Sequence, residues 1–215
     1  MKHRFEVLYE LDTTLGCAVA AYLDAEHYVF LHNKYSPRYE VLKHEGRTIR
    51  IRQKWRQGRV WVGQLCTTEY VPPARFLNYD MSGLPVYMPS IHNLITTRTE
   101  LFYYPDTTGE KTISHLVVDL ELPRFLAPLL PKLEERMISL KKEKDYEDME
   151  MIFRRERLFG RGNVRGYLGD HQFMLHKDDF VEHFGTKEAE ARAAELALAA
   201  APISKQRVGV RELFV

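Results

Sequence analysis

Two histidines and an aspartate near the amino terminus have the types and the spacing of metal ligands. In the stretch DAEHYVFLH, residues 24 to 32, two residues separate Asp24 from His27 and four separate His27 from His32. Residues five apart on a regular helix diverge by about 140°, so the helix must bend or end before both rings can reach one ion. On the residues alone two interpretations stay open, because imidazoles bind metals and also occur as partly buried, hydrogen-bonded groups.

The composition sets the class of molecule that carries this motif. The chain has 215 residues, 45% of them hydrophobic, which suits one well-filled domain with an appended tail. The 31 basic and 30 acidic side chains give a net charge of +1, so no global field draws the protein to nucleic acid. Two cysteines without metal-type spacing favour a reducing compartment, and no run approaches the ~20 apolar residues of a membrane span. We expect a cytoplasmic protein that does not bind nucleic acid.

Alternating apolar residues predict a largely antiparallel β-structure before residue 123. A first strand is expected over residues 3–11, followed by one or two short helices over 12–37. Beyond these helices the pattern predicts a three-stranded meander over 38–71, a loop with short strand pieces over 72–90, and two longer strands over 92–106 and 111–122.

The most helical segment follows these strands. Leu126, Leu130, Leu133, Met137 and Leu140 repeat with the period of an amphipathic helix. The prolines at 128 and 131 restrict regular helix to the residues after them, and the glycines at 160 and 162 close it.

The remaining tail is expected to contain one helix over 186–201, a strand over 171–176 and a short final strand over 207–215. Arginines between 154 and 165 suit either an anion site or the favourable electrostatics of a helix C-terminus.

This order of elements predicts an α+β fold in which a curved antiparallel sheet wraps around a long C-terminal helix and leaves an internal cavity. We assign residues 1–160 to this domain and residues 161–215 to a C-terminal extension, which either covers the cavity or binds a partner. Aromatic residues of the strands either line the cavity or fill the core; they are Trp55, Trp61, Phe76, Tyr79, Phe102 and Tyr103.

Residues 3–160 resemble the START/Bet v 1-like (SRPBCC) helix-grip superfamily, whose members bind hydrophobic ligands. The spacing of Asp24, His27 and His32 is similar to the mononuclear iron motif in the catalytic domain of Rieske-type aromatic-ring-hydroxylating oxygenases. The resemblance implies that His27 and His32 bind iron and that Asp24 supports a histidine and the electron route. It also implies a later aspartate on the long helix as the third ligand.

Asp148 is the preferred third ligand, ahead of Asp145. Steps of four from Leu140 reach Lys144 and Asp148, which places Asp148 near the extension of the apolar face. A carboxylate on that face is costly unless it is paired, hydrogen-bonded or bound to a metal. The alternative is a solvated acidic face whose carboxylates pair with neighbouring lysines or with Arg155.

The resemblance implies an Fe(II) site with open positions for oxygen and substrate. A Rieske cluster needs two cysteines and two histidines in its own domain, whereas this chain has only Cys17 and Cys66 and therefore no such cluster. Electrons would have to come from a separate electron-transfer protein. The expected partner is a hydrophobic small molecule, aromatic or lipid-like. Two other functions stay open, a non-enzymatic carrier or sensor of the START type and an enzyme of the polyketide-cyclase type.

Overall fold

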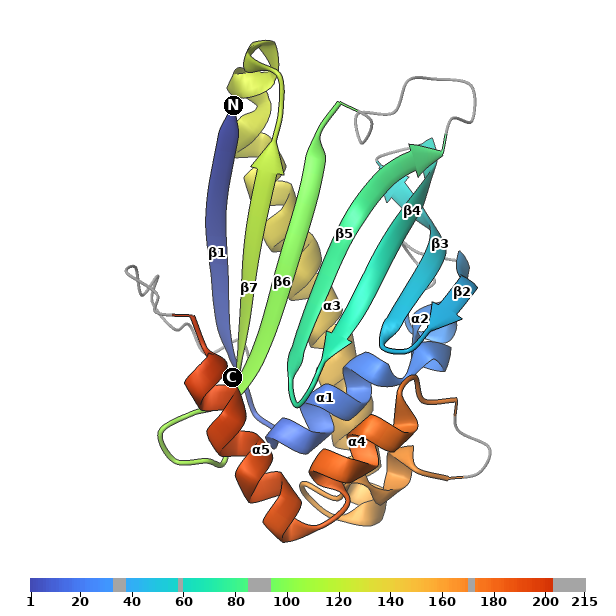
Figure 1. Ribbon diagram of the computed structural model, residues 1–215, viewed down its shortest axis with the longest axis vertical. Coiled ribbons are helices and arrows are strands. Elements are labelled where there is room, and N and C mark those ends of the chain that lie inside the picture. Colours follow the sequence, from blue (N-terminus) through green and yellow to red (C-terminus); the bar gives the residue numbers. More distant parts are fainter. Residues whose placement is uncertain (33–37, 58–59, 85–93, 170–172, 203–215) are drawn as a thin grey trace.

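The computed structural model describes residues 1–32, 38–57, 60–84, 94–169 and 173–202. One antiparallel sheet curves around a long helix, and shorter helices gather at one end of the sheet (Figure 1). The elements run in the order β1 (Lys2–Leu11), α1 (Leu15–Leu23), α2 (Ala25–Phe30), β2 (Arg38–Glu45), β3 (Thr48–Gln57), β4 (Val60–Val71), β5 (Arg75–Leu84), β6 (Thr96–Pro105), β7 (Thr112–Glu121), the 3-10 helix η2 (Arg124–Leu129), α3 (Leu130–Phe159), the 3-10 helix η3 (Val164–Tyr167), α4 (Lys177–Phe184) and α5 (Lys187–Ala200).

The sheet has the strand order β1-β7-β6-β5-β4-β3-β2, so the first strand pairs with the last one. Phe5, Val7 and Tyr9 of β1 alternate with more exposed residues and are buried, as the sequence pattern predicted. The predicted α+β architecture, with its antiparallel sheet and long C-terminal helix, is confirmed. The expected meander is present as β2, β3 and β4.

One predicted loop is wrong. Within residues 72–90, Arg75–Leu84 forms the ten-residue strand β5, which pairs with β4 on one side and β6 on the other. The polar Asn78 and Asp80 interrupt the apolar alternation that would have identified the strand, and Asp80 has a left-handed backbone with φ of 50°. Pairing on both edges compensates for this weak local preference.

Helix α3 begins and ends where the prolines and glycines indicated. Pro128 lies in the 3-10 helix η2, and Pro131 lies in the first turn of α3, where the missing N–H group is not needed for a helical hydrogen bond. Gly160 ends the helix with a φ of 94°, a conformation that favours glycine. The 30 residues of α3 span about 45 Å, enough to follow the full height of the sheet (Figure 1).

The described part of the tail contains two α-helices, so the expectation of a single helix is wrong. Helix α4 has only eight residues, and its first turn is polar because it contains Asp178 and Asp179. Its apolar face is therefore difficult to recognise from the sequence. That face buries Phe180 and Phe184 in the same hydrophobic cluster as α1. The strand expected over 171–176 lies partly outside the described residues, although Met174 forms an isolated bridge with Asp24. The strand expected over 207–215 lies outside them entirely.

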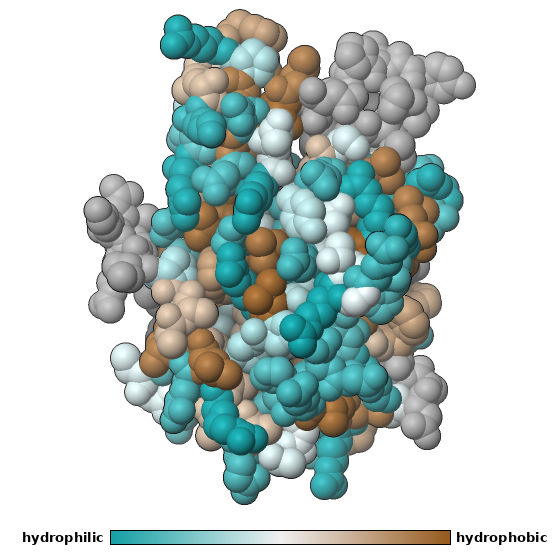
Figure 2. All heavy atoms as spheres, in the orientation of Figure 1, coloured by the Kyte–Doolittle hydropathy of each residue, from teal (hydrophilic) through white to brown (hydrophobic). Residues whose placement is uncertain are grey.

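The visible surface is mostly hydrophilic, with scattered apolar side chains (Figure 2). Among the described residues, no helix is long and apolar enough to cross a membrane.

Candidate metal centre

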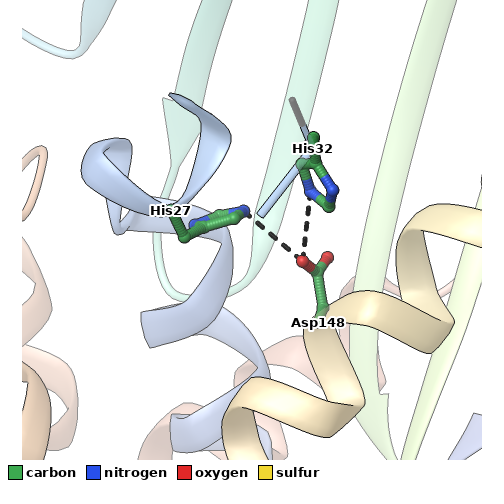
Figure 3. A group of neighbouring side chains, drawn as sticks. All are labelled: His27, His32 and Asp148. Carbon is green, nitrogen blue, oxygen red and sulfur yellow. Dashed lines mark ion pairs between the residues drawn. The ribbon is translucent and has the colours of Figure 1, made fainter. Parts of the chain in front are cut away.

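The structure brings the three predicted ligands together (Figure 3). His27 lies on α2, His32 lies just beyond the end of α2, and Asp148 comes from α3. Asp148 Oδ1 is 3.4 Å from His27 Nε2 and 3.2 Å from His32 Nε2. One ligand atom from each residue lies within 4.8 Å of the other two. Three polar groups from two distant parts of the chain therefore converge on one point.

Because α2 ends between the two histidines, their rings do not diverge as they would on a regular helix. The helix stops at Phe30, and Leu31 N–H donates to the His27 carbonyl at 2.7 Å. His32 therefore leaves the helical path and can turn toward His27, whose ring meets it edge-on at a centroid distance of 5.1 Å. The helix begins at Asp24, whose Oδ1 accepts a hydrogen bond from Glu26 N–H at 3.2 Å. Local capping thus sets the position of both rings.

Asp24 helps to position the site in two ways: it caps the start of α2, and its carboxylate forms an ion pair with Arg155. Its other carboxylate oxygen, Oδ2, accepts from Arg155 Nη2 at 2.8 Å, so Arg155 ties α3 to the start of α2. Arg155 also lies over the Tyr167 ring and donates to the Gly166 carbonyl. This arginine belongs to the basic run between residues 154 and 165, and here it stabilises the protein interior. The Asp24 carboxylate therefore joins the start of α2 to α3.

Glu147 is the site residue that sequence reasoning missed. Its Oε2 lies 2.8 Å from His32 Nδ1, and His32 is only 1% exposed. A proton on Nδ1, donated to Glu147, leaves the Nε2 lone pair directed toward Asp148. A carboxylate behind a histidine commonly fixes the tautomer and orientation of a metal ligand. The signal in the sequence was the acidic pair of Glu147 and Asp148, of which only the second was assigned a role.

The protonation states of the cluster suit a cation. Burial lowers the pKa of His27, against the opposing influence of Asp148. Burial pushes the pKa of Asp148 upward, but His32 and His27 outweigh this effect and hold that pKa below its ordinary value. A neutral imidazole and an ionised carboxylate are the forms that bind metals.

The geometry also fits a metal ion. Asp148 Oδ1 is buried between the Nε2 atoms of the two imidazoles. Ligand atoms bound at about 2.1 Å and at right angles lie about 3 Å apart, close to the separations of 3.2 and 3.4 Å found here. Two imidazoles and one carboxylate form a facial set that leaves other positions open. The buried cluster can therefore bind a divalent metal.

The cluster opens into a cavity of about 710 Å³ between the sheet and α3, and both His32 and Asp148 line it. This volume lies within the range of small-molecule pockets. Phe76 and Tyr103 belong to its wall, whereas the side chains of Trp55 and Trp61 lie outside the described residues. The tail contributes Leu175 and His176, so it does cover part of the cavity. The aromatic lining consists of Tyr22, Tyr39, Tyr70, Phe76 and Tyr103.

Comparisons with known proteins identify the fold. No family model and no curated protein sequence matches the chain. The Zhui aromatase/cyclase from Streptomyces sp. R1128 is similar in structure, with a TM-score of 0.58, 12% identity, and coverage of 75% of this chain and 99% of that one. A START superfamily protein from Mycobacterium smegmatis has a TM-score of 0.55, 14% identity, and coverage of 69% and 99%.

A third similar structure is Ara h 8.0201, with a TM-score of 0.53 and 10% identity over 71% of this chain and 99% of that one. At such low identities the shared feature is the arrangement of sheet and helix. The chain therefore has the helix-grip fold that these structures share.

Proposed function

We propose that the cavity binds a hydrophobic small molecule and that His27, His32 and Asp148 hold one Fe(II) ion beside it. The observation that carries this proposal is that His32 and Asp148 belong both to the ligand cluster and to the cavity wall. A bound metal would therefore meet a bound molecule directly. The low exposure of both histidines, 5% for His27 and 1% for His32, keeps bulk water away from the ligand atoms.

The residues around the cluster have distinct tasks. Glu147 fixes the proton of His32 on Nδ1, and Asp24 sets the start of the helix that carries His27. Iron in a facial site of two histidines and a carboxylate would supply open positions for oxygen and substrate, the chemistry implied by the resemblance to Rieske-type oxygenases. Cys17 lies in α1 and Cys66 in β4, and neither is part of a four-ligand cluster site in the described residues. A separate electron-transfer protein would supply the electrons.

The metal content of anaerobically purified protein tests this proposal. Elemental analysis should find close to one iron per chain, lost in His27→Ala, His32→Ala and Asp148→Ala. His183→Ala is the matched control, because His183 on α4 hydrogen-bonds to the Asp179 carbonyl within its own helix. An iron-free wild type that also fails to take up Fe(II) would refute the metal site. Iron without partner-dependent oxygen consumption would refute oxygenase chemistry alone.

The second candidate is a non-enzymatic carrier or sensor, which the apolar cavity wall and the similarity to a START superfamily structure favour. In this function His27 and His32 would only form hydrogen bonds with Asp148 in the protein interior. Apolar ligand binding that survives both chelation and His27→Ala would favour the carrier. A cyclase, the activity of a second similar structure, would need an acid or base in the cavity. Asp145 is an unsuitable choice, because Lys141 pairs with it.

A further inference from the structure

The sheet and α3 contribute different chemistry to the cavity wall. Each side chain with a permanent charge among the described lining residues comes from α3. The described part of the sheet contributes apolar residues, tyrosines, a cysteine and six neutral polar side chains, which are Gln53, Gln64, Thr68, Asn78, Thr97 and Thr99. A neutral polar group in an apolar wall is costly unless it has a hydrogen-bond partner. The partners of these side chains therefore indicate what a ligand has to supply.

Three of these side chains form hydrogen bonds with one another. Thr68, Asn78 and Thr99 are neighbours across β4, β5 and β6. Thr68 Oγ1 donates to Asn78 Oδ1 at 2.7 Å, and Asn78 Nδ2 donates to Thr99 Oγ1 at 3.2 Å. Asn78 Nδ2 also donates to the hydroxyl oxygen of Tyr22 on α1 at 3.4 Å. This row of the wall therefore has partners within the protein.

Gln53 and Gln64 form a second polar pair in the wall. They are opposite residues of β3 and β4 (Figure 1), so their side chains project from the same face of the sheet, into the cavity. Gln53 is only 8% exposed, and among the residues that the structure describes neither amide has a hydrogen-bond partner. The next pair on this face, Ile51 and Cys66, is apolar, because burial raises the pKa of the Cys66 thiol to about 12 and the thiol keeps its proton. Two adjacent amides therefore face the cavity from apolar surroundings on the sheet.

Tyr39 continues this row onto β2. It lies opposite Gln53 in the sheet and also lines the cavity. Burial raises the pKa of its hydroxyl group above the ordinary value, so the phenol is neutral at neutral pH. The row across the three strands thus carries polar groups without charge, and such a row does not repay the cost of removing an ionic group from water. It favours a neutral ligand group.

The donors and acceptors of the glutamine pair define that group. A glutamine amide has two N–H donors and one carbonyl acceptor, and opposite residues of an antiparallel pair have Cβ atoms about 5 Å apart. A hydroxyl group that lies between the two amides accepts from one and donates to the other. A carboxylate only accepts and loses the hydration of its charge, whereas a methyl group leaves both amides without a partner. The pair therefore suits a hydroxyl group.

We propose that Gln53 and Gln64 form a binding subsite for a hydroxyl group, so that the ligand of the cavity is an apolar alcohol or phenol. This inference rests on the proposed function, because it concerns the ligand of the same cavity, but it does not depend on the metal centre. The body of the ligand packs against apolar lining residues, among them Ile51 on β3 and Leu133 and Met137 on α3. The hydroxyl group fixes the orientation of that body in the cavity.

A ligand series in which one group varies tests the proposal. Naphthol, methylnaphthalene and naphthoate share one aromatic body and carry a hydroxyl, a methyl or a carboxylate group at the same position. Their dissociation constants are measured at neutral pH by displacement of phenylnaphthylamine, a neutral fluorescent probe for apolar cavities, before and after chelation. We expect naphthol to bind the wild type at least about tenfold more tightly than methylnaphthalene, and more tightly than naphthoate, because a buried amide left without a partner weakens binding.

Substitutions locate this preference at the two glutamines. Gln53→Leu and Gln64→Leu replace an amide with an apolar side chain of similar size, so in each variant the preference for naphthol over methylnaphthalene should fall by about tenfold. Methylnaphthalene should bind both variants at least as tightly as the wild type, which also shows that the cavity is intact. Lys54→Leu is the matched control and should keep the wild-type preference, because Lys54 follows Gln53 on β3 but is exposed and does not line the cavity.

The outcomes separate this proposal from the proposed function. Methylnaphthalene that binds the wild type as tightly as naphthol overturns the hydroxyl subsite and still supports an apolar cavity. An unchanged preference in both glutamine variants, an equal loss in Lys54→Leu, or tighter binding of naphthoate than of naphthol also overturns the subsite. Failure of all three compounds to displace the probe overturns both proposals. A glutamine-dependent preference in a wild type that neither contains nor takes up iron supports the subsite and refutes the metal centre instead.

Discussion

Replacing Glu147 with glutamine removes a negative charge behind His32 and keeps a hydrogen-bond acceptor at the same place. Glu147 Oε2 lies 2.8 Å from His32 Nδ1, a short contact typical of a charge-assisted hydrogen bond. Such a bond contributes about 1.5–3 kcal/mol, and about 1.4 kcal/mol corresponds to a tenfold change in an equilibrium constant. The carboxylate side chain is 21% exposed, so water partly compensates for its loss. We therefore expect Glu147→Gln to weaken metal binding by about tenfold and Glu147→Ala by up to about a hundredfold.

An anaerobic competition titration with Fe(II) and a coloured chelator measures these dissociation constants directly. Glu150→Gln is the matched control, because Glu150 is exposed on the same helix and its ion pair with Arg154 is long, at 4.0 Å. The control should bind Fe(II) with wild-type affinity. The reasoning fails if both Glu147 variants bind Fe(II) like the wild type while Asp148→Ala binds none, since the orientation of His32 would then not depend on the carboxylate.

Three further predictions concern stability and are measured by urea unfolding of the metal-free protein. Arg155→Met leaves the buried Asp24 carboxylate without its arginine and should lower the free energy of unfolding by about 2–4 kcal/mol. The control Arg154→Met, on the exposed face of α3, should change it by less than about 0.5 kcal/mol. Equal effects of the two substitutions would contradict the role given to Arg155. Burial lowers the pKa of Lys144 from 10.5 to about 8, so keeping this ammonium charged at neutral pH destabilises the folded protein. Lys144→Met should therefore raise the free energy of unfolding at neutral pH by up to about 3 kcal/mol, and a less stable variant would contradict this reasoning. Burial also holds the pKa of His176 below its usual value, so the unfolded chain binds more protons below about pH 6.5 and stability falls on acidification. His176→Asn, which suits the left-handed backbone at φ 53°, should lose less stability than wild type between about pH 7.5 and about pH 5, and an identical loss would exclude His176 as a contributor.

The parts of the fold that were predictable are those in which neighbouring residues decide the structure. The period of α3 and its limits at Pro131 and Gly160 follow from backbone geometry and from burial of one helical face. Strand β1 is also predictable from the sequence, because its apolar residues alternate with polar ones. Strand β5 is not, because its polar residues and left-handed Asp80 are stabilised by pairing with β4 and β6, and such pairing partners are distant in the sequence.

By itself the sequence determined the spacing of Asp24, His27 and His32, the apolar face of α3 and the succession of strands, because each depends on interactions within a few turns or residues. Only the tertiary structure decided that Asp148 meets the two histidines, that Glu147 lies behind His32 and that Arg155 joins Asp24. These contacts bridge more than 100 residues, and they exist because the sheet curves around α3 (Figure 1) and the fold brings the side chains of α2 within reach of that helix. The cavity has the same origin, since its wall is made of side chains that no local pattern brings together.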